Sequence, residues 1–222
     1  IVLGALAGQV AIILSTHWQW AGLGGLAGTV ILALPFAIIF GYLAGRTLNR
    51  AKGREMIASM VMGFFANGLY QFVFLFLVGT VINIDNPTLR VSAGPGLRNT
   101  IELKYIKQVI DNLWTVRFGM VPIPVITIGI SVILCVVLIY FFRTKLGQDL
   151  RAVGQDRNVA EISGLNVNGL RILAVIISTV LAAWGQIIFL QNIGTLNTYN
   201  SHEQVGTFAI AALLIGGATV AK

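Results

Sequence analysis

Residues 118–142 read FGMVPIPVITIGISVILCVVLIYFF and contain no Asp, Glu, Lys or Arg. A helix needs about 20 consecutive apolar residues to cross the hydrocarbon core of a bilayer, and this run is long enough to do so. The same four residue types are also missing from residues 1–45, 56–84, 172–202 and 204–221. The sequence therefore predicts an all-α polytopic membrane protein, folded as a multi-helix bundle in a single transmembrane domain.

The composition of the whole chain excludes other classes. Of the 222 residues, 56% are hydrophobic and 10% are charged, and the mean hydropathy is +0.85, far above that of soluble domains. A transmembrane β-barrel would alternate polar and apolar residues in segments of about ten. The net charge of +7 lies between the predicted spans, where membrane topology explains it better than nucleic-acid binding does. Because the chain begins and stops within apolar runs, we expect it to be incomplete at both ends.

The positions of the basic residues predict the topology, because cytoplasmic loops are enriched in Lys and Arg. The densest short cluster is Arg46, Arg50, Lys52 and Arg54. Counting from that cytoplasmic loop, we expect spans at about 1–16, 24–45, 56–83, 118–142 and 172–190, an external segment at 84–117 and a cytoplasmic loop at 143–171. The last run, 204–221, is short and contains Gly216 and Gly217, so it either spans or re-enters as a half-helix.

Small residues recur at a spacing of four within the apolar runs, which lets helix backbones approach closely. The pairs are Gly4 with Gly8, Gly24 with Gly28, and Gly41 with Gly45. Such pairs occur in most membrane bundles, so packing within one subunit is favoured over a dedicated dimer seam.

Residues that carry chemistry are scarce in this sequence. No carboxylate or basic side chain lies within the predicted spans, which argues against ion coupling and against a membrane hydrolase. His17 and His202 have no neighbours at metal-ligand spacing, so no metal site and no catalytic residue are predicted. A G-x-x-x-x-G-K-[ST] loop is also missing, and we therefore expect no ATP hydrolysis by such a loop and no cofactor in this chain.

Neutral polar and aromatic side chains are the remaining candidates inside the membrane. Asn67, Tyr70 and Gln71 are spaced three and four residues apart, so they share one helical face. Such side chains can hydrogen-bond the hydroxyls of a passing solute or join helices, and the sequence leaves both alternatives open. The predicted substrate-pathway residues are Asn67, Tyr70, Gln71, Trp184, Gln186 and Gln191.

The loop 143–171, RTKLGQDLRAVGQDRNVAEISGLNVNGLR, contains signals for a short helix over 156–163. Asp156 can cap its N-terminus and Gly164 can end it. The positions on its faces are the i, i+4 pair Arg157 and Glu161 and the apolar residues Val159 and Ile162. A helix of about two turns is marginal alone in water, so it either docks onto a partner or rests on its own bundle.

At this loop the sequence resembles the permeases of bacterial ABC importers of the branched-chain amino acid, monosaccharide and nucleoside type. The residues that carry the resemblance are 144–147 (TKLG), 150–154 (LRAVG), 162–168 (ISGLNVN) and 212–217 (ALLIGG). The resemblance implies a multi-pass protein of the bacterial inner membrane, surrounded by lipid. It also implies a second permease chain, an external solute-binding protein, and cytoplasmic ATPase subunits that hold the ATP and Mg²⁺.

In that family the short cytoplasmic helix is the coupling helix, which sits in a groove of the ATPase. Carried over to this chain, the resemblance implies that the residues coupled to the ATPase are Gly154, Asp156, Arg157, Val159, Glu161, Ile162 and Gly164.

The solute class is predicted less directly. Residues 122–124 and 164–168 are similar to the ribose and galactose branch, whereas residues 55–57 and 150–154 are similar to the nucleoside branch. We expect a small neutral solute, with a monosaccharide favoured and a nucleoside or branched-chain amino acid as alternatives. A facilitative channel or secondary carrier is the alternative from another class, and a membrane enzyme is the least favoured.

Overall fold

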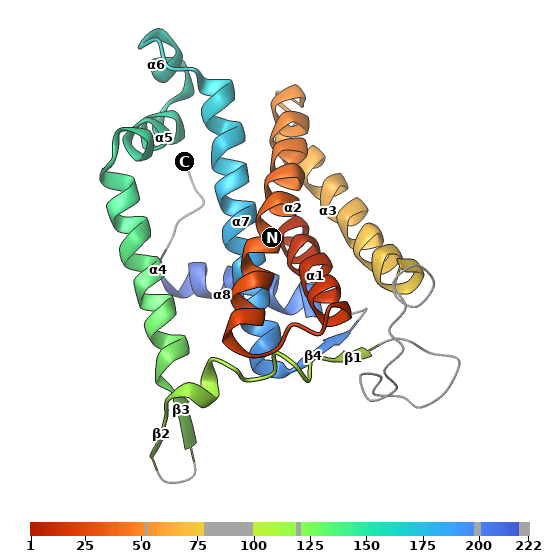
Figure 1. Ribbon diagram of the computed structural model, residues 1–222. Helices are drawn as coiled ribbons and strands as arrows, with labels where there is room; N and C mark the ends of the chain where they lie inside the picture. Colours follow the sequence, from red (N-terminus) through yellow and green to blue (C-terminus); the bar gives the residue numbers. More distant parts are fainter. Residues whose placement is uncertain (52, 78–99, 119–120, 198–200, 218–222) are drawn as a thin grey trace.

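The structure is a computed structural model that describes residues 1–51, 53–77, 100–118, 121–197 and 201–217 (Figure 1). Its helices are α1 (Val2–His17), α2 (Gly22–Arg50), α3 (Glu55–Phe72), α4 (Val125–Arg143), α5 (Lys145–Gln155), α6 (Arg157–Ile162), α7 (Val167–Ile193) and α8 (Ser201–Ile215). A π-helical turn (Val73–Leu77) continues α3, and η3 is a 3-10 turn (Asp111–Leu113). The short strands are β1 (Thr100–Glu102), β2 (Thr115–Phe118), β3 (Val121–Pro124) and β4 (Thr195–Asn197).

Helices dominate the described residues, and the predicted all-α polytopic class is confirmed. Among these residues, four helical segments are long and apolar enough to cross a membrane: α2, α3 with the start of its π-helical turn, α4 and α7. The strands form only two antiparallel pairs, β1 with β4 and β2 with β3. Helix α8 runs across the long axes of α4 and α7 instead of along them (Figure 1), and the two alternatives for 204–221, a span or a re-entrant half-helix, stay predictions.

The helix bounds differ from the predicted spans in several places. Helices α2 and α7 extend beyond 24–45 and 172–190, because polar residues at their ends continue the backbone hydrogen bonding past the apolar run. The predicted positions that lie outside the described residues are Lys52, 78–83, 84–99, 119–120 and 218–221.

The predicted span 118–142 is helical only from Val125 onward. The preceding residues form a hairpin, in which β2 pairs with β3 in the register Thr115↔Pro124 to Phe118↔Val121. Pro122 and Pro124 lie in β3, and a proline disfavours helical geometry in the residue before it. Residues 121–124 are therefore extended, and α4 begins seven residues after the predicted start of the span.

The loop 143–171 contains one helix more than predicted. Helix α5 occupies Lys145–Gln155, and the Thr144 hydroxyl caps it by accepting from the Gly147 N–H at 3.3 Å. Its side chains are mostly polar, so it does not appear in the sequence as a long apolar run. The predicted short helix follows as α6, and only four residues lie between the end of α6 and the start of α7.

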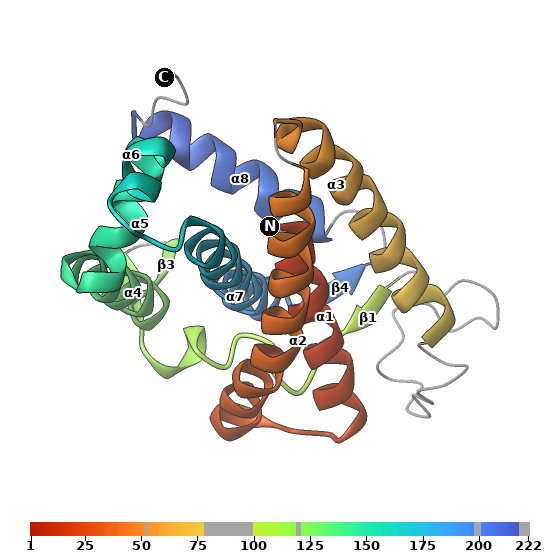
Figure 2. The same cartoon turned by 90° about the horizontal axis from the view of Figure 1, so that it is seen from above.

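Helix α7 is packed against α1 and α2 through glycines on those two helices, and Figure 2 shows it beside both of them. A Cβ added at Gly4 of α1 would lie 2.5 Å from the Cβ of Ala182, and one at Gly41 of α2 would lie 2.8 Å from the Cα of Ile176. The backbones therefore meet at distances that only glycine permits. Gly8 and Gly45 face α7 in the same way, so these two pairs pack helices within the chain, as predicted.

The third glycine pair does not form a contact between helices. An added Cβ at Gly24 would meet nothing within 4 Å, and one at Gly28 would meet the ring of Trp20 at 2.8 Å.

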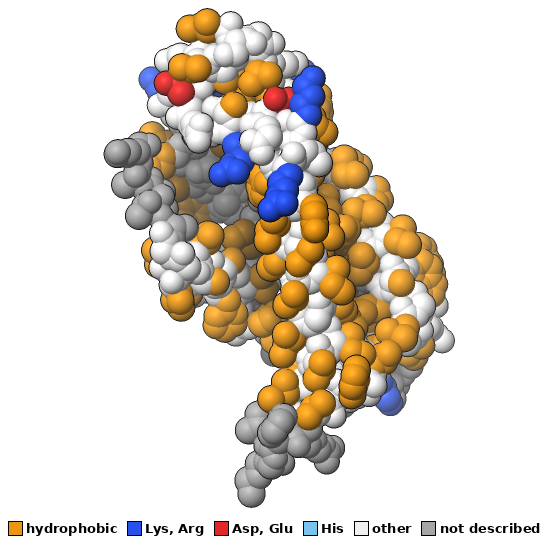
Figure 3. Space-filling model, turned by 90° about the vertical axis from the view of Figure 1, so that its left-hand side faces the viewer, with side chains coloured by type: hydrophobic (Ala, Val, Ile, Leu, Met, Phe, Trp, Pro, Cys, Tyr) orange, Lys and Arg blue, Asp and Glu red, His pale blue; other side chains and the backbone are white. Residues whose placement is uncertain are grey.

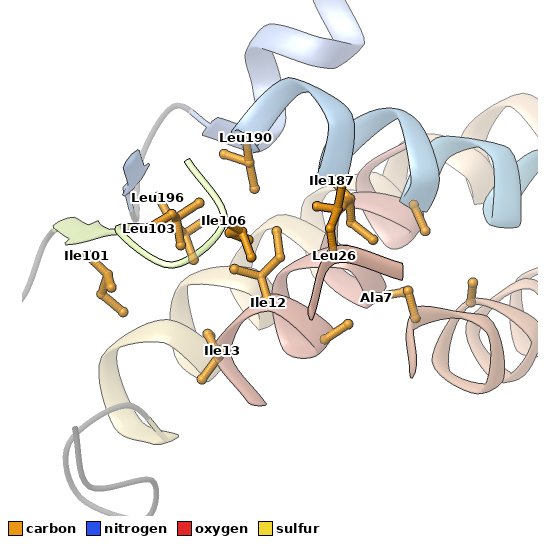
Figure 4. Close-up of a cluster of buried hydrophobic side chains, with 14 of the residues drawn as sticks. Ala7, Ile12, Ile13, Leu26, Ile101, Leu103, Ile106, Ile187, Leu190 and Leu196 are labelled. Atoms are coloured by element: carbon orange, nitrogen blue, oxygen red, sulfur yellow. The ribbon is translucent and has the colours of Figure 1, made fainter. Parts of the chain in front are cut away.

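The end of the bundle near β1 and β4 is closed by residues 100–113. Ile101, Leu103, Ile106 and Ile110 are buried among apolar side chains of α1, α2 and α7 (Figure 4). Strand β1 pairs with β4 in the register Thr100↔Asn197 to Glu102↔Thr195, and the Leu103 N–H donates to the Gly194 carbonyl at 2.9 Å. The segment predicted to be external and polar thus contributes apolar side chains to the core.

The two ends of the bundle differ in character. Helices α5 and α6 lie at the end opposite the strands (Figure 1), and the side view shows Lys, Arg, Asp and Glu side chains gathered there above a mostly apolar surface (Figure 3). The C-terminus of α2 and the N-terminus of α7 also meet at this end, where the Asn49 side chain donates to the Asn168 carbonyl at 2.8 Å. The predicted assignment of this end to the cytoplasm stays a prediction.

Replacing Gly4 by Ala tests the close packing of α7. The added methyl group would overlap Ala182 and the Thr179 carbonyl, so we expect a loss of about 1–3 kcal/mol in the free energy of unfolding. Gly129→Ala on α4 is the control, since its added Cβ meets nothing within 4 Å. Thermal unfolding in detergent measures both, and equal midpoints for the two variants would contradict the packing described here.

Candidate functional site

Helix α6 has the ends that the sequence predicts. The Asp156 carboxylate accepts from the N–H groups of Asn158 at 2.8 Å and Val159 at 3.1 Å, which satisfies two donors at the helix N-terminus. At the other end Gly164 has a φ of +80°, and its N–H donates to the Glu161 carbonyl at 3.1 Å. Local hydrogen bonds therefore make α6 a defined helix of six residues between α5 and α7.

Most side chains of α6 are exposed and point away from the bundle. Ala160 faces inward, with 2% of its surface exposed, whereas Val159 is 58% exposed and Ile162 is 87% exposed. Apolar side chains this exposed, at a charged end of the molecule, are typical of a surface that binds a protein partner. Within the described residues no ion pair joins Arg157 to Glu161, so the predicted i, i+4 pair is not formed.

A hollow of about 390 Å³ lies behind α6, between α5, α7 and the start of α3. Gly154 and Arg157 are part of its wall, together with Glu55 and Arg171. The seven predicted coupling residues fall into three groups. Val159, Glu161 and Ile162 are exposed on α6, Gly154 and Arg157 line this hollow, and Asp156 and Gly164 cap the helix.

An ion pair joins the elements around the hollow. The Arg171 guanidinium on α7 donates to the Glu55 carboxylate at the start of α3, with 3.2 Å between Nη2 and Oε1. Both side chains are about one quarter to one third exposed, so solvent screens the pair only in part. The starts of α3 and α7 are thereby held together next to α6.

Helix α5 is joined tightly to the end of α4. The Gln148 side chain donates to the Phe142 carbonyl at 2.6 Å, and the Thr144 N–H donates to the Phe141 carbonyl at 3.0 Å. A Cβ added at Gly147 would lie 2.5 Å from the Cα of Phe142, so only glycine fits beneath this turn. A displacement of α5 would therefore also move the end of α4.

Two of the predicted pathway residues, Asn67 and Tyr70, tie α3 to the start of α8. The Asn67 amide donates to Glu203 Oε1 at 3.1 Å, and its oxygen accepts from His202 Nε2. The Tyr70 ring stacks on the His202 ring with 4.0 Å between centroids, and its hydroxyl donates to the Asn197 carbonyl at 3.4 Å. Tyr70 and His202 are fully buried, so these groups form a polar link between helices.

Gln71, the third residue of the predicted face, is half-buried on α3. The sequence did not predict the contact between His202 and Asn67, because the two residues lie 135 positions apart.

A cavity of about 510 Å³ lies next to this polar link, between α1, α2, α3, α7 and α8. Gly63 and Gly206, each about one turn from Asn67 or Glu203, are part of its wall. Its side chains are uncharged, and three of them carry hydroxyls: Ser59, Ser178 and Thr179. The cavity is of the size that small-molecule sites have, and its lining suits a neutral solute.

The other three predicted pathway residues have different neighbours. Trp184 lines an apolar hollow of about 420 Å³ between α2, α4 and α7. Gln186 is fully buried beside Gly8 of α1. The Gln191 amide donates to the Asp111 carboxylate at 3.2 Å. These residues join helices or line the apolar hollow, and the structure does not gather them with Asn67 and Tyr70.

Over residues 2–221 the chain matches the family described as "Branched-chain amino acid transport system / permease component". The chain belongs to this family. The resemblance seen in 144–168 and 212–217 is therefore confirmed. Membership of this permease family, together with four helices able to cross a membrane, makes it a multi-pass protein of the bacterial inner membrane.

Two curated relatives show what related permeases are named for. The fructose import permease protein FruG of Bifidobacterium longum (strain NCC 2705) is 26% identical over 196 residues, which cover 86% of this chain and 51% of the relative. The nucleoside ABC transporter permease protein NupB of Lactococcus lactis subsp. cremoris (strain MG1363) is 23% identical over 195 residues, which cover 85% and 50%. The chain thus spans about half the length of these relatives. No solved structure matches it.

Replacing Asn67 by Leu tests the polar link between α3 and α8. The change leaves His202 and Glu203 without their shared partner, and we expect it to cost about 1–3 kcal/mol in stability. Gln71→Leu, which also replaces a side-chain amide by leucine one turn along α3, is the control and should cost less. Thermal unfolding of both variants in detergent measures the difference, and equal losses would show that the link has no special role.

Proposed function

We propose that this chain is part of the permease subunit of an importer that is driven by ATP hydrolysis on partner subunits. The observation that carries the proposal is α6, a capped helix with Val159 and Ile162 exposed at the charged end of the bundle. Its partners would be cytoplasmic ATPase subunits, a second permease chain and an external solute-binding protein. ATP and Mg²⁺ would bind to the ATPase subunits, and this chain would supply no catalytic residue and no metal site.

The coupling would proceed by rigid-body movement. When two ATPase subunits close on ATP, a groove that holds Val159 and Ile162 would carry α6 with it. Helix α6 is continuous with α5 and α7 through short connections, and α5 is bonded to the end of α4. The displacement would therefore reach two long helices at once, α4 and α7.

The solute we propose is small, neutral and rich in hydroxyls. The cavity beside α3 and α8 has uncharged walls, with the hydroxyls of Ser59, Ser178 and Thr179 and the nearby amide of Asn67 as hydrogen-bonding groups. A monosaccharide is the first candidate, supported by a relative named for fructose import. A nucleoside is the second, supported by a relative named as a nucleoside permease. A branched-chain amino acid fits less well, because its two charges would meet no opposite charge in these walls.

A facilitative channel or secondary carrier remains the alternative from another class. It would account for the apolar bundle, but it would leave Val159 and Ile162 exposed without a partner. Uptake that persists in proteoliposomes lacking the ATPase and the binding protein would favour this alternative.

Replacing Ile162 by Glu tests the docking of α6. The side chain is 87% exposed, so the permease should fold as before, while a charge placed in an apolar groove should lower ATPase binding at least about tenfold. Ile162→Leu is the matched control and should bind normally. Co-purification of the ATPase and ATP-driven uptake are the measurements, and unchanged binding by Ile162→Glu would rule out α6 as the docking element.

The solute class can be tested on the cognate binding protein. A thermal-shift screen against pentoses, hexoses, nucleosides and branched-chain amino acids should give a response to sugars, or else to nucleosides, because both are neutral solutes that suit the cavity walls. A response to leucine or isoleucine alone would contradict the proposed solute and leave the rest of the proposal standing.

A further inference from the structure

Helix α4 stands apart from the rest of the bundle along its middle. None of its described residues is buried, and its contacts are mainly with α5 at one end and with η3 and β2 at the other. Ile130 and Leu134 of α4 line an apolar hollow of about 420 Å³ together with Ile187 and Ile188 of α7. The position of α4 relative to α7 therefore depends on its two ends.

At the end near the strands, Ile126 and Ile130 of α4 pack against the apolar core, and one carboxylate makes the polar contact between α4 and α7. Thr127 of α4 donates its hydroxyl to Asp111 Oδ1. From α7, the side-chain amides of Gln191 and Asn192 donate to Asp111 Oδ2 at 3.2 and 2.8 Å. Asp111 is only 8% exposed, and no ion pair to it is found within the described residues.

Three donors converge on the two carboxyl oxygens of Asp111, and a carboxylate can accept from all of them. An ionised Asp is purely an acceptor with two oxygens, whereas Asn has one acceptor oxygen and an NH₂ group that would face another donor. Hydrogen bonds to a charged acceptor are also stronger than those between neutral groups. The side chain at position 111 is thus chemically suited to hold α4 and α7 together at this end.

We propose that Asp111 is the positioning residue that fixes α4 to α7 and so passes the movement of α5 and α6 to the opposite end of the bundle. This inference rests on the proposed function. Because no described residue of α4 is buried, little of a displacement at α5 is absorbed by repacking along the helix. It reaches η3 and the β2–β3 hairpin, on the face where the external binding protein would dock.

The first test uses the assembled complex of permease, ATPase and binding protein in proteoliposomes. In Asp111→Asn we expect the stimulation of ATPase activity by the binding protein to fall about tenfold, while basal ATPase activity stays within about twofold. Glu102→Gln is the matched control, since it removes one negative charge from the same segment but from an exposed ion pair with Lys107. It should be stimulated like the parent.

Exchanging the side chains of positions 111 and 192 distinguishes a loss of helix positioning from a general loss of structure. The double variant Asp111→Asn with Asn192→Asp returns a carboxylate to the pair and lets the two side chains bond again, so stimulation should recover in part. Thr127→Val, which removes only the bond from α4, should lower stimulation without changing the thermal unfolding midpoint by more than a few degrees. Failure of the swap to recover any stimulation would overturn the proposal.

A distance measurement tests directly whether Asp111 holds α4 in position relative to α7. Cys135 is the single cysteine of the chain and is exposed on α4, and Ile39→Cys on α2 offers a second exposed site on the part packed against α7. Spin labels at these sites should change their separation between the nucleotide-free and ATP-trapped states of the parent. In Asp111→Asn the separations should broaden and stop depending on nucleotide.

The outcomes distinguish a failure of the proposed function from a failure of the proposed role of Asp111. If the parent complex shows no uptake driven by ATP, the proposed function fails and the role of Asp111 falls with it. If the parent transports and Asp111→Asn is stimulated as strongly as Glu102→Gln, only the role of Asp111 is overturned.

Discussion

The close approach of α7 to α1 and α2 is the constraint on which the rest of the structure depends. At Gly4 and Gly41 there is no room for even a methyl group, so the backbones of α1 and α2 lie directly against α7. Contacts of this kind supply helix association where lipid offers no hydrophobic driving force. The two ends of α7 then adjoin the elements of the two proposals, α6 before Val167 and the Asp111 partners Gln191 and Asn192.

Several polar groups inside this bundle are bonded to one another between elements. The Asn67 amide contacts both His202 and Glu203, and the Asp111 carboxylate accepts from hydroxyl and amide donors. Such bonds specify how the helices are positioned relative to one another. A permease that passes a neutral solute and takes its energy from another chain is compatible with this arrangement.

Local signals in the sequence were sufficient for several features. The long runs without charge predicted the apolar helices, and Asp156 with Gly164 predicted both ends of α6, because capping depends on residues a few positions apart. Helix α5 and the β2–β3 hairpin were missed, since one is a polar helix and the other lies within an apolar run. The predicted solute-pathway residues are only partly brought together, because Trp184, Gln186 and Gln191 on α7 have other neighbours than Asn67 and Tyr70 on α3.

By itself, the sequence determined that this is a membrane bundle, which family it resembles and where the short α6 begins and ends. Those properties depend on composition, on short motifs and on neighbouring residues. The tertiary structure alone decided that Asn67 meets His202 across 135 residues and that Asp111 holds Thr127 and Asn192 together across α4 and α7. Such pairings follow from how the helices pack, and no single sequence window contains both partners.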